Sequence, residues 1–481
     1  MTIKKKKKAA SADNEGQNEW LGSMPVSCAV EEGNRTAIEE CLEGALPGSG
    51  IKVFALKQTV GERFTGGRST PVFEIELHDS EGYTHKLILK LVVQASPSTG
   101  ENMTSLQQGY AMRVRSYEVE AGFYGCFDSN SPSKDTPCPA RALQKLGLAL
   151  PNLLFVERGG VHVTPGIKGA AISFIMQDLR ITHPVHPESL SLKQTRAALD
   201  WLARMHARFW EAPKLFNEWA GSKVWECGSF WANKYRLERN SENWTPGKVE
   251  SSWVDTLRWL QKKDPNVATM SGVKRLGSRM DACRLGLHQA LHGNPSQVTN
   301  LSPVVYMPNS ECGKRQHGHQ LRRHRTLVHG DYKAANMFFA DDISERNVTH
   351  DACAVCDFQF SGPGLGAIDI CYLLFPDARA DYASNELALM DWYHSRLGAH
   401  MTDMGKCDAF EDYSRGALEL HYRLAQVDFL AYLVGKGWVA SAVPDIALIL
   451  GVHKTMAHID EGEVMSETDY SAAIDASFAE V

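Results

Sequence analysis

Three short segments of strand-like composition follow one another near the start of the chain, at residues 51–56, 71–77 and 86–93. Each is rich in apolar and β-branched residues, and turn-forming stretches rich in Gly and Ser separate them. Strands in series with short connections favour an antiparallel meander. A helix over residues 106–127 and a further apolar strand at 171–176 are predicted to follow.

The hydrophobic spacing changes to a helical one beyond residue 178. Leu199, Leu202, His206 and Phe209 recur at intervals of three and four, which predicts an amphipathic helix. More helical patterns extend to about residue 291 and again from residue 385 onward. A polar insertion and two short strand signals lie between these two helical stretches.

The insertion covers residues 293–325 and is rich in Gly, Pro, Ser and His, which indicates an exposed loop. The strand signals that follow it centre on Leu327 and Val355. Strands first and helices later predict an α+β architecture with a β-rich N-lobe and a larger helical C-lobe.

We therefore divide the 481 residues into a polar tail at 1–25, an N-lobe at 26–178 and a C-lobe at 179–481. The tail contains five consecutive lysines, Lys4 to Lys8, which are typical of a solvated segment, although a nuclear address or an anionic surface contact stays open. It lacks the apolar core of a signal peptide, and no apolar stretch of about 18 residues predicts a membrane span.

Composition excludes several classes of protein. Hydrophobic residues make up 43% and charged residues 22%, as in ordinary folded proteins. The net charge of -6 gives no general basic field, so nucleic acid is not an expected partner. Eleven cysteines without regular spacing indicate reduced thiols, which predicts a cytoplasmic protein. The oligomeric state is not predicted.

Two polar motifs at the ends of apolar segments suggest phosphoryl transfer. The first places Asp331 directly after a strand signal and Asn336 five residues later. Such a loop can supply a carboxylate to meet an acceptor hydroxyl and an amide oxygen to hold Mg²⁺ beside the phosphates. The second places Asp357 at the end of another strand, where a lone carboxylate suits a metal that bridges phosphates.

These motifs carry a family resemblance. His329-Gly330-Asp331 with Asn336, followed by Asp357-Phe358-Gln359 and Asp369, resembles the aminoglycoside phosphotransferase and choline kinase group. The likeness is greatest to its ecdysteroid-kinase-like branch, also called CHK kinase-like, and it covers roughly residues 50–452.

The resemblance implies a two-lobed protein-kinase-like fold and an ATP- and Mg²⁺-dependent kinase that phosphorylates a hydroxyl of a small molecule. By that likeness Asp331 is the catalytic base, Asn336 and Asp357 are Mg²⁺ ligands, and Asp369 braces the catalytic loop. His329 is expected to hold the loop by packing and hydrogen bonding.

Lys90 lies in a strand that is apolar on both sides, so its ammonium needs a partner. A kinase would use Lys90 to contact the α- and β-phosphates of ATP, with Glu120 as its ion-pair partner. Glu118 lies two residues away on a different face of the helix, and an edge lysine that reaches water is the alternative for Lys90.

Two further nucleotide contacts are expected from position alone. The loop that covers the nucleotide should precede the second strand and contain Gly61, Gly66 and Gly67, although a hairpin turn would have the same composition. The hinge whose backbone meets adenine should lie at Met176, Gln177 and Asp178.

The acceptor is expected to be a small molecule. Only eleven residues separate Asp357 from Asp369, too few for the activation segment of a protein kinase. Eight of the eleven tryptophans lie between Trp201 and Trp259, where they pack a helical core or line an acceptor pocket. A steroid-like alcohol, a choline-like amino alcohol and a sugar all stay open.

Two other functions are compatible with the sequence. A pseudokinase that binds nucleotide and acts as an interaction module would keep the fold, but the intact Lys90, Asp331, Asn336 and Asp357 disfavour it. A protein kinase is disfavoured by the short segment after Asp357.

Lys333 matches the lysine of the protein-kinase catalytic loop, which places a positive charge near the γ-phosphate. We expect Lys333→Ala to lower turnover more than nucleotide affinity, because this charge acts on the group being transferred. Steady-state kinetics beside nucleotide-binding titrations measure both quantities. Unchanged turnover would contradict the assigned role.

Overall fold

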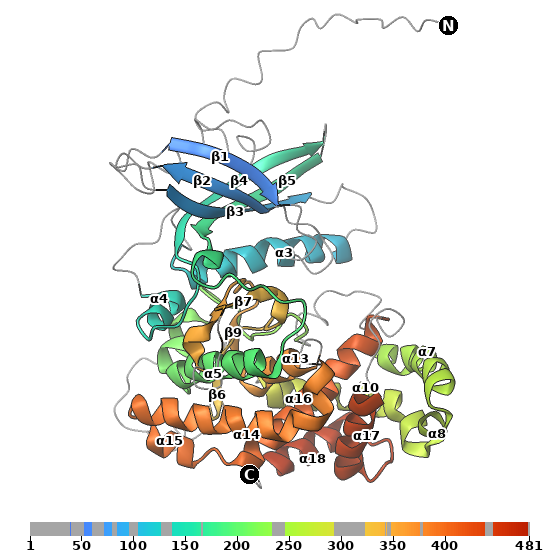
Figure 1. Cartoon of the computed structure of the whole chain (residues 1–481). Coiled ribbons are helices and arrows are strands. Elements are labelled where there is room, and N and C mark those ends of the chain that lie inside the picture. The colour runs from blue at the N-terminus through green and yellow to red at the C-terminus, as the bar shows by residue number, and fades with distance from the viewer. Residues whose placement is uncertain are drawn as a thin grey trace, which may run out of the picture.

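The computed structural model describes residues 39, 52–59, 72–78, 84–95, 104–126, 137–164, 167–232, 246–292, 323–341, 343, 348–375, 379–437 and 446–479. A curved sheet and one long helix form one end of the molecule, and a group of helices forms the other (Figure 1). This is the α+β arrangement that the sequence predicted, with a β-rich N-lobe and a larger helical C-lobe. The predicted tail at 1–25 lies outside the described residues.

The sheet of the N-lobe has five strands in the order β1-β2-β3-β5-β4. Their bounds are β1 Lys52–Thr59, β2 Val72–His78, β3 Thr84–Ala95, β4 Leu153–Thr164 and β5 Ile167–Gln177. All neighbouring strands are antiparallel, so the predicted meander of the first three strands is confirmed. Strand β4 was not predicted, because charged residues and a Gly pair interrupt its apolar pattern.

Lys90 occupies the middle of this sheet. It lies opposite Val72 of β2 and opposite Phe174 of β5, so strand neighbours flank it on both sides. Leu89 and Leu91, its chain neighbours, point to the opposite face and are buried. The face that carries Lys90 is turned toward helix α3 (Thr104–Phe123), as its hydrogen bond to Glu120 of that helix shows.

The C-lobe consists mainly of helices (Figure 1). They are α5 Leu192–Phe209, α7 Lys248–Lys263, α8 Pro265–Thr269, α9 Ser271–Lys274, α10 Leu276–His292, α13 Ala367–Leu374, α14 Arg379–Asp403, α15 Cys407–Glu411, α16 Arg415–Gly435, α17 Ile446–Asp460 and α18 Glu467–Ala479. Helix α4, Pro139–Gln144, lies in sequence between α3 and strand β4. No helix within the described ranges has both the length and the apolar character needed to cross a bilayer.

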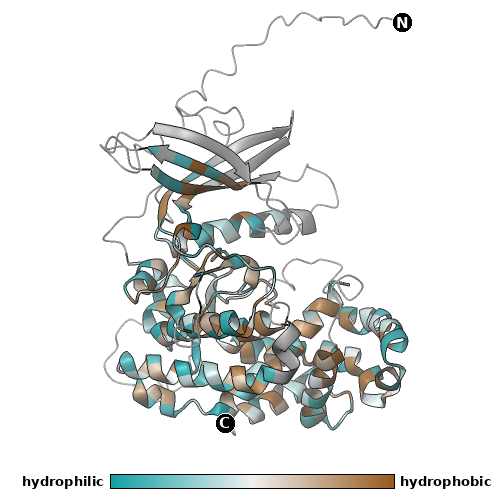
Figure 2. Ribbon diagram, viewed as in Figure 1, coloured by the Kyte–Doolittle hydropathy of each residue, from teal (hydrophilic) through white to brown (hydrophobic). Residues whose placement is uncertain are grey.

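Helix α5 confirms the amphipathic pattern read from the sequence. Its N-terminus is closed by a capping box, in which Ser191 and Gln194 hydrogen-bond reciprocally through side chains and backbone. Leu199, Leu202 and Phe209 on its apolar stripe are buried in the main core. The C-lobe helices carry both polar (teal) and apolar (brown) residues (Figure 2).

Two short antiparallel pairs carry the motifs of the C-lobe. Strand β6 (Arg325–Val328) pairs with β9 (Gly362–Leu365), and β7 (Met337–Phe339) pairs with β8 (Cys353–Val355). The strand signals predicted around Leu327 and Val355 are thereby confirmed. Strand β5 ends at Gln177 and a short 3-10 turn, η2 (Leu179–Ile181), follows, so we propose that the lobes divide there.

A buried ion pair closes the far end of the C-lobe. Asp460 at the end of α17 accepts two hydrogen bonds from Arg279 of α10, at 2.8 and 2.6 Å, and one from the Tyr470 hydroxyl at 2.6 Å. Neither ionic side chain has any solvent exposure. Loss of one partner would leave the other charge buried without compensation.

We expect Asp460→Asn to lower the free energy of unfolding by roughly 3 kcal/mol, because the Arg279 guanidinium loses its counter-charge. Chemical denaturation measures the change. Asp255→Asn is the matched control, since Asp255 pairs with Arg258 at the surface with 75% of its side chain exposed. The control should change stability by less than about 0.5 kcal/mol. Equal shifts in both variants would contradict the importance of the buried pair.

Candidate active site

One buried ammonium joins the two lobes. Lys90 Nζ donates to Glu120 Oε2 on α3 and to Asp357 Oδ1 in the C-lobe, each at 2.7 Å. Glu118, the alternative partner weighed from sequence, instead binds Arg158 at 2.9 Å. The structure therefore brings Lys90, Glu120 and Asp357 together.

The three charges shift one another strongly. Burial lowers the pKa of Lys90, but the negative charges of Asp357 and Glu120 outweigh this effect and raise the pKa well above its ordinary value. Burial raises the pKa of Glu120 to about 7, against the opposing charge of Lys90. For Asp357, contact with Lys90 overcomes burial and holds the pKa below its ordinary value. Lys90 is thus charged, and Asp357 is its main counter-ion.

The catalytic loop begins where strand β6 ends. Asp369 of α13 is fully buried and accepts hydrogen bonds from the backbone amides of His329, at 2.6 Å, and Gly330, at 2.9 Å. Gly330 has a φ of +83°, and a Cβ there would lie 2.2 Å from the carbonyl oxygen of Phe360. Only glycine fits this position. Asp369 therefore fixes the bend that presents Asp331.

His329 connects the catalytic loop, residues 329–336, to residues 356–361, which we call the metal loop after the role expected of Asp357. Its Nε2 hydrogen-bonds to the carbonyl oxygen of Cys356 at 3.0 Å, and its Nδ1 faces the Asp331 amide at 3.3 Å. This pattern requires the neutral Nε2–H tautomer, and burial lowers the pKa of His329 in agreement. Its contacts match the loop-holding role expected from the sequence.

Asn336 and Asp357 come together because strands β7 and β8 pair. The Cys356 amide donates to the Asn336 carbonyl oxygen at 3.0 Å, which extends the ladder by one bond. Asp357 follows with a φ of +69°, in a left-handed conformation that is costly for a residue with a side chain. Such strain is common at functional sites.

Asp331 lies beside both the amide and the lysine expected near it. Asn336 Nδ2 donates to the Asp331 backbone oxygen at 2.8 Å and to its Oδ2 at 3.3 Å. Lys333 Nζ is 3.0 Å from the same Oδ2. Burial raises the pKa of Asp331, although the charge of Lys333 opposes this. A carboxylate with a raised pKa is a better proton acceptor than an ordinary aspartate.

The structure describes only some of the residues that we expect to contact the nucleotide. Gly61, Gly66 and Gly67 lie outside the described residues. Met176 and Gln177 end strand β5, and Met176 is buried beside the sheet core. The Asp178 side chain caps the η2 turn and binds Arg180 at 2.6 Å, so the hinge contact, if made there, must come from backbone atoms.

The segment that contains these two loops matches a known family. Residues 277–406 match a model of the ecdysteroid kinase-like family. This part of the chain is similar to that family. The family resemblance predicted from Asp331, Asn336, Asp357 and Asp369 is therefore confirmed over the segment that contains all four. No curated protein matches the sequence.

Several solved structures resemble this chain at low identity. A microcompartment-associated aminopropanol kinase is 12% identical, with a TM-score of 0.37 over 87% of this chain and 94% of that one. A Plasmodium vivax ethanolamine kinase is 11% identical, with a TM-score of 0.31 and coverages of 86% and 85%. An aminoglycoside-3'-phosphotransferase of type VIII is 13% identical, with a TM-score of 0.30 and coverages of 78% and 98%.

The tryptophans of the C-lobe pack its core. Six of the seven that the structure describes between residues 201 and 259 are buried, with exposures of 8% or less: Trp201, Trp210, Trp219, Trp225, Trp231 and Trp253. This burial supports the packing alternative for the group. Half-buried rings lie beside the catalytic loop instead: Phe230 contacts Phe360 and Tyr372 at centroid distances of 5.8 and 5.1 Å.

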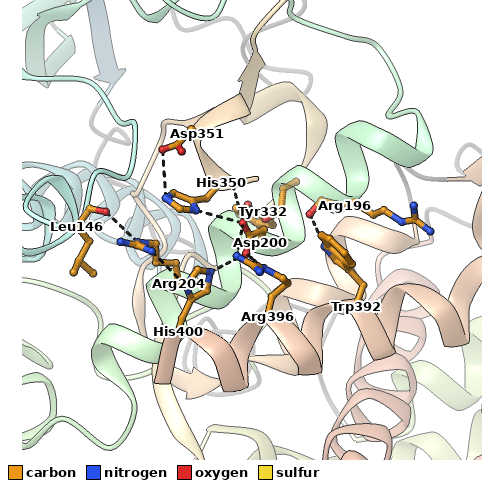
Figure 3. Close-up of polar contacts among 11 residues, drawn as sticks. Leu146, Arg196, Asp200, Arg204, Tyr332, His350, Asp351, Trp392, Arg396 and His400 are labelled. Carbon is orange, nitrogen blue, oxygen red and sulfur yellow. Dashed lines mark hydrogen bonds and ion pairs between the residues drawn. The ribbon is translucent and has the colours of Figure 1, made fainter. Parts of the chain in front are cut away.

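Sequence inspection missed a buried carboxylate that braces the metal loop (Figure 3). Asp200 of α5 accepts from the His350 amide at 2.8 Å, from His400 Nε2 at 2.7 Å and from Arg396 Nε at 2.5 Å. His350 opens the short turn η5 (His350–Ala352), which leads into β8 and Asp357. The network therefore connects the metal loop to α5 and α14. No local sequence motif predicts it, because its residues lie far apart in the chain.

The stability contributed by Asp200 should depend on pH. Burial alone would raise its pKa, but hydrogen bonds from His350, His400 and Arg396 outweigh burial and lower the pKa well below its ordinary value. A carboxyl group whose pKa is lower in the folded state than in the unfolded state stabilises the fold. The contribution is fully present at pH values above the unfolded-state pKa of about 4. That contribution is lost as the pH falls from about 4 toward the folded-state pKa.

We expect Asp200→Asn to lower the free energy of unfolding by roughly 3 kcal/mol at pH 7. The difference in free energy of unfolding between wild type and variant should become smaller as the pH drops below about 4, since the wild-type carboxylate then becomes protonated and loses its ionic hydrogen bonds. Urea denaturation at several pH values measures this difference. The control, Asp391→Asn, removes an exposed partner of Arg415 and should have little effect. A difference that does not change with pH would contradict the linkage.

Proposed function

We propose that this chain is an ATP-dependent kinase that transfers the γ-phosphoryl group to a hydroxyl of a small molecule. The position of Lys90 carries the proposal. A largely buried ammonium, 2.7 Å from carboxylates of both lobes, is suited to hold the α- and β-phosphates of a nucleotide between those lobes. Glu120 then keeps Lys90 aimed at the phosphates.

The proposed metal ligands are Asn336 and Asp357. Their donor atoms are oxygens, which Mg²⁺ prefers, and Mg²⁺ typically takes only one or two protein ligands beside phosphate and water. When bound, Mg²⁺ would neutralise the charge of the β- and γ-phosphates. Asp357 is held below its ordinary pKa by Lys90, so it is ionised and ready to act as a ligand.

Asp331 is the proposed catalytic base. Its position near the start of the loop, fixed by Asp369 through two backbone amides, lets it accept the proton of the acceptor hydroxyl. Lys333, 3.0 Å away, supplies a positive charge to the phosphoryl group in transfer. Both groups belong to one short loop, so their separation is fixed by local geometry.

The acceptor is proposed to be a small alcohol. Residues 358–368 are occupied by strand β9, which pairs with β6, and by the approach to α13, so they offer no long platform for a peptide. The half-buried Phe230, Phe360 and Tyr372 form the proposed wall of the acceptor site. Steroid-like alcohols, amino alcohols and sugars remain the candidate acceptors.

Two further assignments rest on the sequence. The loop around Gly61, Gly66 and Gly67 is proposed to cover the nucleotide, and the backbone at 176–178 to meet adenine. The cytoplasm is proposed as the location, because it supplies ATP and keeps scattered cysteines reduced.

The purified chain, incubated with γ-labelled ATP, Mg²⁺ and a metabolite extract, should transfer label to a small molecule. Asp331→Asn should lower this transfer by about 10²- to 10⁴-fold and keep the Mg²⁺-dependent ADP shift in melting temperature, because it removes only the base. Asp357→Ala should lose that shift, because it removes a metal ligand.

The exposed Asp255→Asn variant is the control and should match wild type in both assays. If no metabolite gains label while the Mg²⁺-dependent shift persists, the chain is a nucleotide-binding pseudokinase. If the shift itself is missing from wild type, the proposed nucleotide site is wrong.

A further inference from the structure

A segment of the C-lobe contacts helix α3, the metal loop and the catalytic loop at once. It comprises residues 221–231, which we call the strap, and it follows η3 (Leu215–Trp219). We propose that the strap supplies the alignment that a protein kinase obtains from its activation segment, with Trp225 and Gln359 as positioning residues for Asp357. The catalytic part of this inference rests on the proposed kinase function.

The first contact holds α3 by hydrogen bonds and close packing. Arg115 NH2 donates to the carbonyl oxygens of Gly221 and Ser222, at 2.9 and 3.0 Å. About two turns later, Gly122 meets the strap so closely that a Cβ would lie 2.6 Å from the Lys223 carbonyl oxygen. Any side chain at this position would push α3 off the strap.

The second contact is apolar and lies next to the ion-pair glutamate. Val119 of α3 forms a buried cluster with Trp225, Cys227 and Ala232. Val119 directly precedes Glu120 and has no exposed surface. The strap therefore packs against the turn of α3 that aims Glu120 at Lys90, and movement of α3 would open this cluster to water.

The third contact runs from the strap to the metal ligand. Trp225 donates its backbone amide to the Ser361 carbonyl oxygen and its indole Nε1–H to the Gln359 carbonyl oxygen, each at 2.8 Å. The Gln359 side-chain amide donates to Asp357 Oδ2 at 3.3 Å. Lys90 binds the other oxygen, Oδ1. The orientation of the Asp357 carboxylate is thus fixed from both sides.

Gln359 also contacts α3 directly. The Ser116 hydroxyl, one turn before Glu120, donates to the Arg113 carbonyl oxygen at 2.8 Å and lies 3.4 Å from Gln359 Oε1. The Gln359 side chain therefore lies between α3 and Asp357, and its backbone is held by Trp225. A glycine at this position, as in the Asp-Phe-Gly motif, could make neither side-chain contact.

The fourth contact reaches the catalytic loop. The Ser229 amide donates to the Phe360 carbonyl oxygen at 3.1 Å, and the Phe230 amide donates to the Gly330 carbonyl oxygen at 3.2 Å. Gly330 precedes Asp331, so the strap touches the residue beside the proposed base. Ser229 has a φ of +99°, a conformation that is kept only where the surroundings impose it.

The test compares two variants that each remove one buried indole donor. Trp225→Phe removes the bond to Gln359, and Trp253→Phe removes an equivalent bond from Trp253 Nε1 in α7 to the Val273 carbonyl oxygen at 2.8 Å, which does not involve the strap. Two quantities are measured: hydrogen exchange of α3 amides without ligand, and the Mg²⁺ concentration for half-maximal ADP binding.

Trp225→Phe should speed exchange of α3 amides and raise the half-maximal Mg²⁺ concentration, each by roughly three- to tenfold, as expected for one lost hydrogen bond. Trp253→Phe should lower the melting temperature without moving either quantity. Gln359→Met keeps the chain length, removes the amide donor and should raise the Mg²⁺ requirement like Trp225→Phe. It serves as the second variant if Trp225→Phe folds poorly.

Equal behaviour of the Trp225 and Trp253 variants in both measurements would overturn the proposal. Trp225→Phe could change the exchange of α3 amides while both Trp225→Phe and Gln359→Met leave the Mg²⁺ requirement unchanged. That result would overturn the proposed positioning of Asp357. If wild type does not bind Mg²⁺ and ADP, the proposed function fails, and the exchange of α3 in the free protein alone decides the role of the strap.

Discussion

The burial of one ammonium between two carboxylates is the constraint on which the site depends. Lys90 and Asp357 are 267 residues apart in sequence, yet their charged atoms lie 2.7 Å apart. A buried charge without a partner costs several kcal/mol, so the sheet that holds Lys90 and the loop that holds Asp357 must keep a fixed relative position. Glu120 adds helix α3 to the same requirement. The two lobes are joined where the proposed chemistry takes place.

The C-lobe keeps its two loops in a fixed position through buried hydrogen bonds to neighbouring helices. Helix α5 contributes to two braces: His206 lies 3.4 Å from Asp369, which holds the catalytic loop, and Asp200 holds the turn that leads to Asp357. Both aspartates are fully buried and receive hydrogen bonds from backbone amides. Acceptors of this kind fix backbone positions more firmly than packing alone, because an unsatisfied buried amide is costly. The proposed strap adds a brace from the side of α3.

The short stretch of sequence between Asp357 and Asp369 determines how the two loops are held in place. Strand β9 occupies part of that interval and returns the chain directly to α13, so no long segment is available to change position. Contacts to the metal loop then come from elsewhere in the chain, above all from Trp225. An alignment built from buried hydrogen bonds and close backbone contacts favours one arrangement of the loops, since intermediate positions leave polar groups unpaired.

The sequence by itself determined the order of strands and helices, the family resemblance and the residues of the two C-lobe motifs. These features are local: periodicity reports which face of an element is buried, and a short loop fixes the spacing of Asp331 and Asn336. Strand β4, whose Gly pair breaks the pattern, was missed. Only the tertiary structure decided that Glu120 rather than Glu118 meets Lys90, and that Gln359 and Asp200 brace the metal loop. Such contacts join residues distant in sequence, and no local pattern encodes which polar groups meet after the chain has packed.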